Sequence, residues 1–405
     1  MDKILADVTG LLGVAILVAI VARRLRLPYT VGLVLAGIGL AAAQFKTDAV
    51  LTHDFIFDLI LPPLLFEATL SLSWRDIVRD WPPILALSTI GVALSAALFA
   101  LGLIAVLDWP LAPALVFGVL IAATDPIAVI AMFRDAGVKG RLALLIESES
   151  LVNDGVAAVL FALALAWVQA NRDGAAAQTA FALTLLGVVG GGVAVGLVAG
   201  AAAIVIAGRT NDPLVETALT AVAAYGSFLA AERFHMSGVL ACVAAGVLMG
   251  NLGILRHEAQ AFSLSAGGRQ FVVAFWDFAA FIANSFVFLM MGLSIGAMPF
   301  ATLGAFALGV AIALSLLARA LAVYPLCWLF ARTRWAVSPG QRHMLWWGGL
   351  RGALALALAL ALPQTLPFRA EIQIAAFGVV AFSVVVQGLT MPMIMRWLGA
   401  ASPDA

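Results

Sequence analysis

LALLIESESLVNDGVAAVLFALALAWVQ, residues 142–169, is the stretch of sequence that decides the fold. A helix needs about 20 mainly apolar residues to span a bilayer, and this stretch supplies them while carrying Glu147, Glu149 and Asp154. Asp154 lies about twelve residues into the predicted helix, roughly 18 Å along it, near the middle of a hydrocarbon core about 30 Å thick. Ionisable groups at that depth are costly and usually face the protein interior or a water-filled path. Asp154 is therefore the first candidate functional residue.

The same helix carries further polar side chains. Ser150 lies one turn before Asp154 and Glu147 one turn before Ser150, so the three share a face. The alternative is a polar face packed against other helices, with its carboxylates neutralised by burial, and Glu147 could equally lie at the cytoplasmic interface.

Composition places the whole chain in a membrane. Of its 405 residues, 64% are hydrophobic and 11% charged, whereas soluble domains carry about 25% charged residues. The formal net charge of zero gives no footprint for nucleic acid. We find no GxxxxGK[ST] phosphate loop, so transport driven directly by ATP is unsupported. Cys242 and Cys327 are expected to be packing residues, and no cofactor is expected.

The apolar segments predict an all-α polytopic membrane protein with about thirteen transmembrane helices. They run over residues 4–22, 28–45, 54–72, 82–107, 111–133, 142–169, 178–207, 213–233, 237–252, 270–296, 299–331, 343–363 and 370–397. The first is kept as a membrane helix because it lacks the basic leader and cleavage site of a signal peptide. Residues 1–405 form one transmembrane domain without a soluble domain in this prediction. Its parts are a first inverted six-helix repeat (1–169), a linker helix (178–207) and a second repeat (213–397).

Basic residues predict the orientation. With the N-terminus outside, loops after odd-numbered helices are cytoplasmic and hold about fifteen of the 22 Lys and Arg residues, against about five on the other side. The C-terminus is then cytoplasmic, and the expected location is the cell inner (plasma) membrane. Arg319 and Arg351 are left over inside predicted helices. Each needs a counter-ion, and Glu149 is the natural partner for Arg319.

Two helices are interrupted at corresponding positions, which is the best sequence pointer to a transporter's substrate site. One break is at Thr124–Asp125–Pro126 and the other at residues 348–352, GGLRG. We expect these interrupted helices to cross in mid-membrane. Pro126 cannot donate a backbone hydrogen bond and disfavours helical geometry at Asp125. Asp125 could then bind a cation through oxygen, or neutralise a half-helix N-terminus.

Several other polar residues are open to two interpretations. Glu67 follows the Pro62–Pro63 kink and could be a cation-site or pH-sensing carboxylate, or could satisfy backbone groups loosened by the kink. Asp277 and Asn284 mark one face of a helix, for which we favour helix packing. The histidines, all at or near predicted loops, are expected to be solvated: His53, His235, His257 and His343.

Five motifs resemble the bacterial monovalent cation:proton antiporter family 1, sodium/proton antiporters related to the animal sodium/proton exchangers. The resemblance covers essentially the whole chain. The motifs are LPPLLFEA (61–68), TDPIAV (124–129), ESESLVNDG (147–155), LLARALAVY (316–324) and GGLRGALALALAL (348–360).

That resemblance implies a homodimer in the lipid bilayer, in which a mobile core moves against an interface domain. It implies that Asp154 binds Na⁺ and a proton alternately, and that Asp125, Ser150, Glu67 and the Thr124 backbone carbonyl complete the Na⁺ site. Glu149 would pair with Arg319 as a structural ion pair, alongside Arg351. Asn153 beside Asp154 matches the Asn-Asp pair associated with electroneutral exchange.

The predicted function is electroneutral exchange of Na⁺ for H⁺ by alternating access. Burial disfavours a charged carboxylate and a nearby cation favours it, so Na⁺ and a proton would compete for one group. Exchange of K⁺ or Li⁺ for H⁺ is an alternative in the same class. A cation channel, or a membrane sensor or scaffold without flux, is an alternative in another class.

Overall fold

The computed structural model describes residues 2–25, 27–45, 51–135, 138, 140–172, 181–254 and 264–398. His257 and the predicted start of the linker helix at 178–180 lie outside them. Within the described residues there is no strand, and eight helices are long and apolar enough to cross a membrane. The all-helical, polytopic membrane prediction is confirmed. The count of thirteen and the inverted repeats stay predictions.

Two compact units divide the chain. The first comprises residues 1–56, 82–157 and 284–405, and the second comprises 57–81 and 158–283. Two long helices, α9 (Arg141–Arg172) and α13 (Ala266–Ala297), contribute to both. The prediction of a single domain built from two repeats stays a prediction.

The first unit contains most of the helices. They are α1 (Asp2–Leu25), α2 (Tyr29–Ala42), α5 (Trp81–Leu85), the π-helical turn η2 (Ala86–Gly91), α6 (Val92–Leu107), α7 (Leu111–Ala122), α8 (Ile127–Asp135), α14 (Phe300–Leu303), α15 (Ala305–Leu329), α16 (Pro339–Trp347), α17 (Ala353–Leu360), α18 (Arg369–Phe382), the π-helical turn η4 (Ser383–Gln387) and α19 (Gly388–Trp397).

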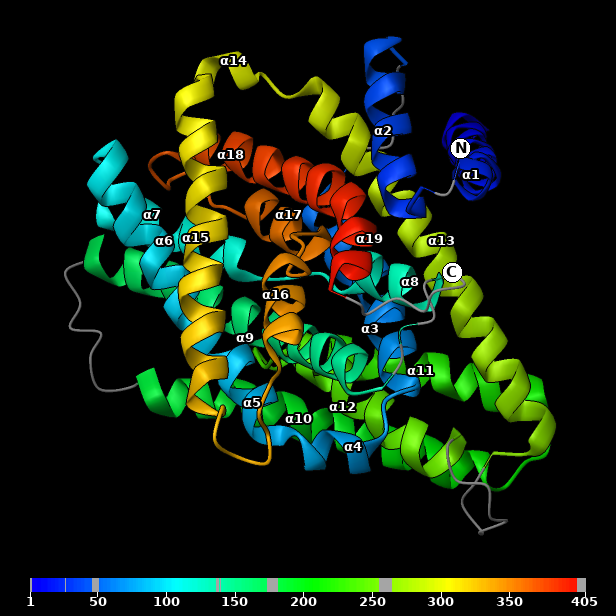
Figure 1. The fold of residues 1–405 in the computed structure, drawn as a ribbon. Coiled ribbons are helices and arrows are strands. Elements are labelled where there is room, and N and C mark those ends of the chain that lie inside the picture. The colour runs from blue at the N-terminus through cyan, green and yellow to red at the C-terminus, as the bar shows by residue number, and fades with distance from the viewer. Residues whose placement is uncertain are drawn as a thin grey trace. The chain divides into compact units, whose positions relative to one another are not determined.

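Small residues let the helices of this unit approach closely. Without a hydrophobic drive between helices in lipid, packing depends on close backbone contact. Gly118 of α7 lies against the Ala96 carbonyl of α6, and Gly37 of α2 lies against Leu289 and Gly292 of α13. Figure 1 shows α6 and α7, in blue to cyan, beside the yellow α15, against which α6 packs. The two interrupted helices, α7–α8 and α16–α17, belong to the same unit, in which α7 packs on α6 and α17 and α16 packs on α15.

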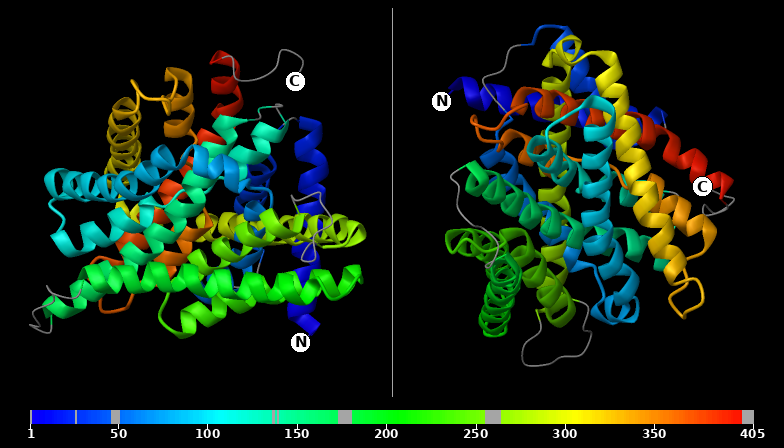
Figure 2. Two further views of the ribbon diagram at one scale, coloured as in Figure 1. Left: turned by 90° about the horizontal axis from the view of Figure 1, so that it is seen from below. Right: turned by 90° about the vertical axis from the view of Figure 1, so that its left-hand side faces the viewer.

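The second unit is built around a group of glycine-mediated helix contacts. Its elements are the π-helical turn η1 (Phe55–Ile60), α3 (Leu61–Leu70), α4 (Trp74–Arg79), α10 (Phe181–Ala207), α11 (Pro213–Arg233), α12 (Gly238–Met249) and the π-helical turn η3 (Gly250–Ile254). Gly192 and Gly196 of α10 meet the backbone of Ser237 and Ala241 at α12. Figure 2 shows α10 to α12 in green from two further sides.

Candidate functional site

The two interrupted helices cross within the first unit. The chain between α7 and α8 is non-helical at residues 123–126, and the chain between α16 and α17 is non-helical at residues 348–352. The backbone N–H of Asp125 donates to the carbonyl of Leu350 over 2.7 Å. The Asp125 side chain also occupies the space that a Cβ on Gly352 would need. The predicted crossing of the two breaks is therefore present, and only glycine fits at its closest contact.

Arg351 compensates the end of the first half-helix. Its Nη1 donates to the carbonyl oxygens of Ala122, over 2.7 Å, and Ala123, over 3.1 Å. These carbonyls close α7, whose C-terminal end carries partial negative charge. The end of this half-helix therefore supplies negative charge to Arg351, and the predicted part of Arg351 in a structural ion pair stays a prediction.

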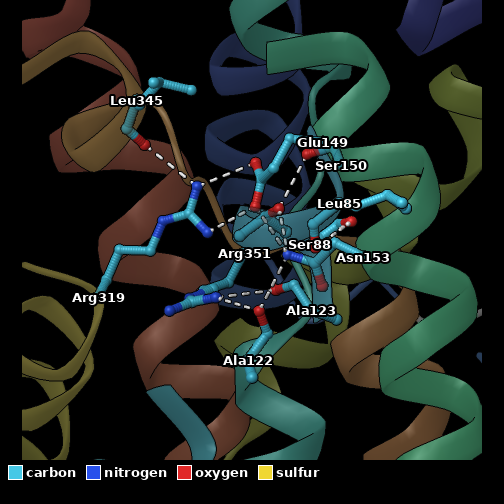
Figure 3. Close-up of polar contacts among 11 residues, drawn as sticks. Leu85, Ser88, Ala122, Ala123, Glu149, Ser150, Asn153, Arg319, Leu345 and Arg351 are labelled. Carbon is cyan, nitrogen blue, oxygen red and sulfur yellow. Dashed lines mark hydrogen bonds and ion pairs between the residues drawn. The ribbon is translucent and has the colours of Figure 1, made fainter. Parts of the chain in front are cut away.

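Arg319 of α15 and Glu149 of α9 form a bidentate ion pair, with N–O distances of 2.9 and 3.0 Å. Their side chains are 6% and 2% exposed. The same guanidinium donates to the carbonyl of Leu345 on α16 over 3.1 Å. Figure 3 shows Arg319 reaching from α15 toward both partners. The pair therefore ties three helices together, and Arg319 compensates the charge of Glu149.

A cluster of neutral polar side chains connects this ion pair to the first break. The hydroxyls of Thr124 and Ser150 lie 2.8 Å apart. The Asn153 amide donates to the Thr124 hydroxyl over 3.0 Å and to the Glu149 carboxylate over 3.3 Å. Figure 3 shows Asn153, Glu149 and Ser150 together. All of these side chains are buried. Rotation of any one of them would disturb the others, so the cluster fixes the break against α9.

Asp154, next along α9, is different. It is 6% exposed, and its Oδ1 has no hydrogen-bond partner in the part of the chain that the structure describes. Its electrostatic neighbours are two further carboxylates, Asp125 and Glu149. A buried carboxylate without a hydrogen bond is costly unless it takes up a proton or a cation. Asp154 is therefore a candidate to take up one proton or one small cation.

The remaining predicted residues are described one by one. Glu67 lies on α3 in the second unit, where it is partly buried and has interaction partners, so its place in the cation site stays a prediction. Asp277 is exposed on α13 and Asn284 is partly buried, so the helix packing expected for this face stays a prediction. His343 is also not a solvated loop residue, since it lies on α16 and contacts the Tyr324 hydroxyl over 2.5 Å. His53 lies 3.1 Å from Asp54.

Two polar residues beside the second break were not predicted. Ser383 accepts a hydrogen bond from the Arg351 backbone N–H, and Gln387 donates to the Trp347 carbonyl. Their signal in the sequence is weak but present, because they are polar residues four apart in the apolar run VVAFSVVVQGL, residues 379–389.

Comparison with known proteins gives one consistent result. The family model described as sodium/hydrogen exchanger, transmembrane, matches residues 12–397. The Na⁺/H⁺ antiporter ApNhaP of Aphanothece halophytica is 38% identical over 403 residues, covering 98% of this chain and 75% of that protein. The Na⁺/H⁺ antiporter NhaH of Halobacillus aidingensis is 34% identical, covering 96% of this chain and 97% of that protein.

The fold also matches a solved structure. The sodium proton antiporter MjNhaP1 of Methanocaldococcus jannaschii superposes with a TM-score of 0.75 at 20% identity, covering 98% of this chain and 99% of that one.

Proposed function

Because the chain belongs to the sodium/hydrogen exchanger family, we propose that it exchanges Na⁺ for H⁺ across a membrane, with Asp154 as the group that both ions use. It is a multi-pass membrane transporter rather than an enzyme.

One observation carries the proposal. Asp154 is buried, its Oδ1 has no partner among the described residues, and the nearest carboxylate–arginine pair, Glu149 with Arg319, is already satisfied. A proton and a sodium ion cannot both neutralise one carboxylate, since each favours the form that the other displaces. If the protein changes its access only when Asp154 is neutral, the flux of one ion obliges the flux of the other.

The other ligands of Na⁺ would be oxygens near the first break. A small hard cation prefers carboxylate, hydroxyl, carbonyl and water oxygens. We assign Asp125, Ser150 and the Thr124 carbonyl to that role. Glu67 is kept as a further ligand on the family resemblance alone. The contact between the Thr124 and Ser150 hydroxyls supports the assignment of these two residues together.

Exchange would be electroneutral, with one proton for one Na⁺. The side chain beside Asp154 is the neutral Asn153, whose amide is committed to Thr124 and Glu149. A carboxylate at that position would lose both donated bonds and would face Glu149 as a like charge. Asp154 is then the single group that changes its charge in the transport cycle, so one Na⁺ moves in one direction for each proton that moves in the other.

We further propose a homodimer in the plasma membrane with the N-terminus outside and the C-terminus cytoplasmic. The family resemblance supports the dimer, and the distribution of Lys and Arg supports the orientation. Exchange of K⁺ or Li⁺, and a channel lined by the same oxygens, are the alternatives.

The decisive experiment uses purified protein in sealed vesicles with an acidic lumen. External Na⁺ should alkalinise the lumen, and K⁺ with valinomycin should leave the initial rate unchanged at any imposed potential. Asp154→Asn keeps the shape of the side chain and should abolish exchange. Ser95→Ala is the control. It removes a buried hydroxyl of the same unit that, like Asp154 Oδ1, has no hydrogen-bond partner among the described residues, and this variant should exchange Na⁺ for H⁺ at the wild-type rate.

Each other outcome has a clear meaning. Full exchange by Asp154→Asn would refute the role of this carboxylate. A response to K⁺ alone would keep the mechanism and change the ion. A current that continues without proton flux would indicate a channel.

A further inference from the structure

The π-helical turn η4, between α18 and α19, contacts both ends of the second helix break. Gln387 Nε2 donates to the carbonyl of Trp347, the last residue of α16, over 3.0 Å. Gln387 Oε1 accepts from the Ser383 hydroxyl over 2.7 Å, and that hydroxyl accepts from the Arg351 N–H over 2.8 Å. The two side chains thus form one continuous chain of hydrogen bonds across the break.

This chain supplies what the unwound backbone lacks. A helix break frees carbonyl and N–H groups, and buried backbone groups need partners. Gly348 N–H and Gly349 N–H still bond back into α16. The Trp347 carbonyl and the Arg351 N–H instead use η4, leaving the Leu350 carbonyl to accept from Asp125.

We propose that Ser383 and Gln387 are positioning residues that hold residues 348–352 at both ends and thereby set where Asp125 lies in the ion site. The proposal rests on the exchange function proposed above. Neither residue belongs to the proposed ion site. They act through Leu350, whose carbonyl accepts from the Asp125 backbone N–H, and through Gly352, which lies against the Asp125 side chain.

The burial of the pair explains why it can act in this way. Ser383 is 1% exposed and Gln387 3% exposed, so water cannot readily replace either side chain. Loss of one would leave the next group in the chain without its bond, and an unsatisfied buried group is more costly than the bond itself is stabilising. π-helical turns also occur frequently at functional sites, since the extra residue redirects side chains. After such a loss, residues 348–352 would move toward other hydrogen-bond partners and would shift Asp125 with them.

The test compares four variants with the wild type. Ser383→Ala and Gln387→Met break the chain, and Ser383→Thr retains a hydroxyl. Thr390→Val is the matched control, because Thr390 lies one turn further on and accepts from the indole N–H of the same Trp347 over 3.0 Å, without touching the backbone of the break.

Two readouts are needed. Amide hydrogen exchange over peptides that contain residues 348–354 should be about tenfold faster in Ser383→Ala and Gln387→Met, the expected effect of losing one buried bond. In the vesicle assay the KM for Na⁺ should rise about tenfold with the maximal rate within about twofold, since the ion's binding geometry and not the amount of folded protein is altered. Ser383→Thr should restore both, and Thr390→Val should change neither.

The outcomes separate this proposal from the function on which it rests. Unchanged amide hydrogen exchange in Ser383→Ala and Gln387→Met would refute the proposal that these residues hold residues 348–352, whatever the transport result. Faster amide exchange with an unchanged KM for Na⁺, or with only a lower maximal rate, would overturn its link to the ion site. If the wild type itself moves no cation, the proposed function fails, and the hydrogen-exchange result still decides whether the pair holds the break.

Discussion

Removal of one charge from the Glu149–Arg319 pair should destabilise the protein far more than removal of both. In Arg319→Gln, the Glu149 side chain would remain 2% exposed and would lose two of the three hydrogen bonds that it is described as accepting, namely those at 2.9 and 3.0 Å. Breaking a buried ion pair in this way costs about 3–5 kcal/mol, whereas neutral replacement of both partners is often without cost. We therefore expect Arg319→Gln to lower the free energy of unfolding by about 4 kcal/mol. The double variant, Arg319→Gln with Glu149→Gln, should have a free energy of unfolding within about 1 kcal/mol of that of the wild type.

Denaturant unfolding in detergent, followed by tryptophan fluorescence, measures this difference. Trp346 and Trp347 are suitable reporters because they follow Leu345, whose carbonyl accepts from Arg319. Glu149→Gln alone completes the double-mutant cycle, which isolates the coupling energy. The reasoning is refuted if Arg319→Gln unfolds within about 0.5 kcal/mol of wild type, or if the double variant is as unstable as the single one.

Three further outcomes follow from contacts and charges already described. Gly352→Ala places a methyl group where the Asp125 side chain lies. Displacement of Asp125 by about 1 Å should reduce the rate of Na⁺ exchange in the vesicle assay roughly tenfold to a hundredfold. Transport at the wild-type rate would show that the site tolerates this shift. In Gly196→Ala, the added Cβ would overlap the Ala241 carbonyl. The free energy of unfolding in the same assay should fall by about 1–3 kcal/mol. An unchanged free energy of unfolding would mean that α10 and α12 can move apart without cost. Alanine at Gly39, which has nothing within 4 Å, is the control for both. If Na⁺ and a proton compete for one carboxylate, the apparent KM for Na⁺ should fall about tenfold per pH unit as pH rises through the competitive range; a KM independent of pH would exclude a shared site.

The sequence predicted the parts of the site that break a rule of membrane sequences. Asp154 was found because a carboxylate at mid-helix is costly, and the crossing of the breaks was expected because Asp125–Pro126 and Gly352 interrupt two otherwise apolar helices. These signals depend on residue type and position alone. They persist whatever the details of packing.

What the sequence could not provide is the identity of backbone partners. Arg351 was expected to need a counter-ion. Its contacts with the carbonyls of Ala122 and Ala123 could not be predicted, because carbonyl groups are present at every residue. Ser383 and Gln387 were missed for a related reason. They are uncharged, so a search for costly charges passes over them. Only the folded structure shows that they face an unwound backbone.

The bond between Arg351 and the end of α7 has a consequence for the order in which the protein is made. Ala122 and Arg351 are 229 residues apart, so at about 5–20 residues per second a ribosome would take roughly ten to fifty seconds to add the arginine after the alanine. During that interval the carbonyls that close α7, and the amide of Asp125, lack the partners that they have in the finished protein. Backbone groups without hydrogen-bond partners are costly in lipid. The first break of the nascent chain must therefore bond to water, to the insertion machinery or to temporary protein partners until the last helices have been made.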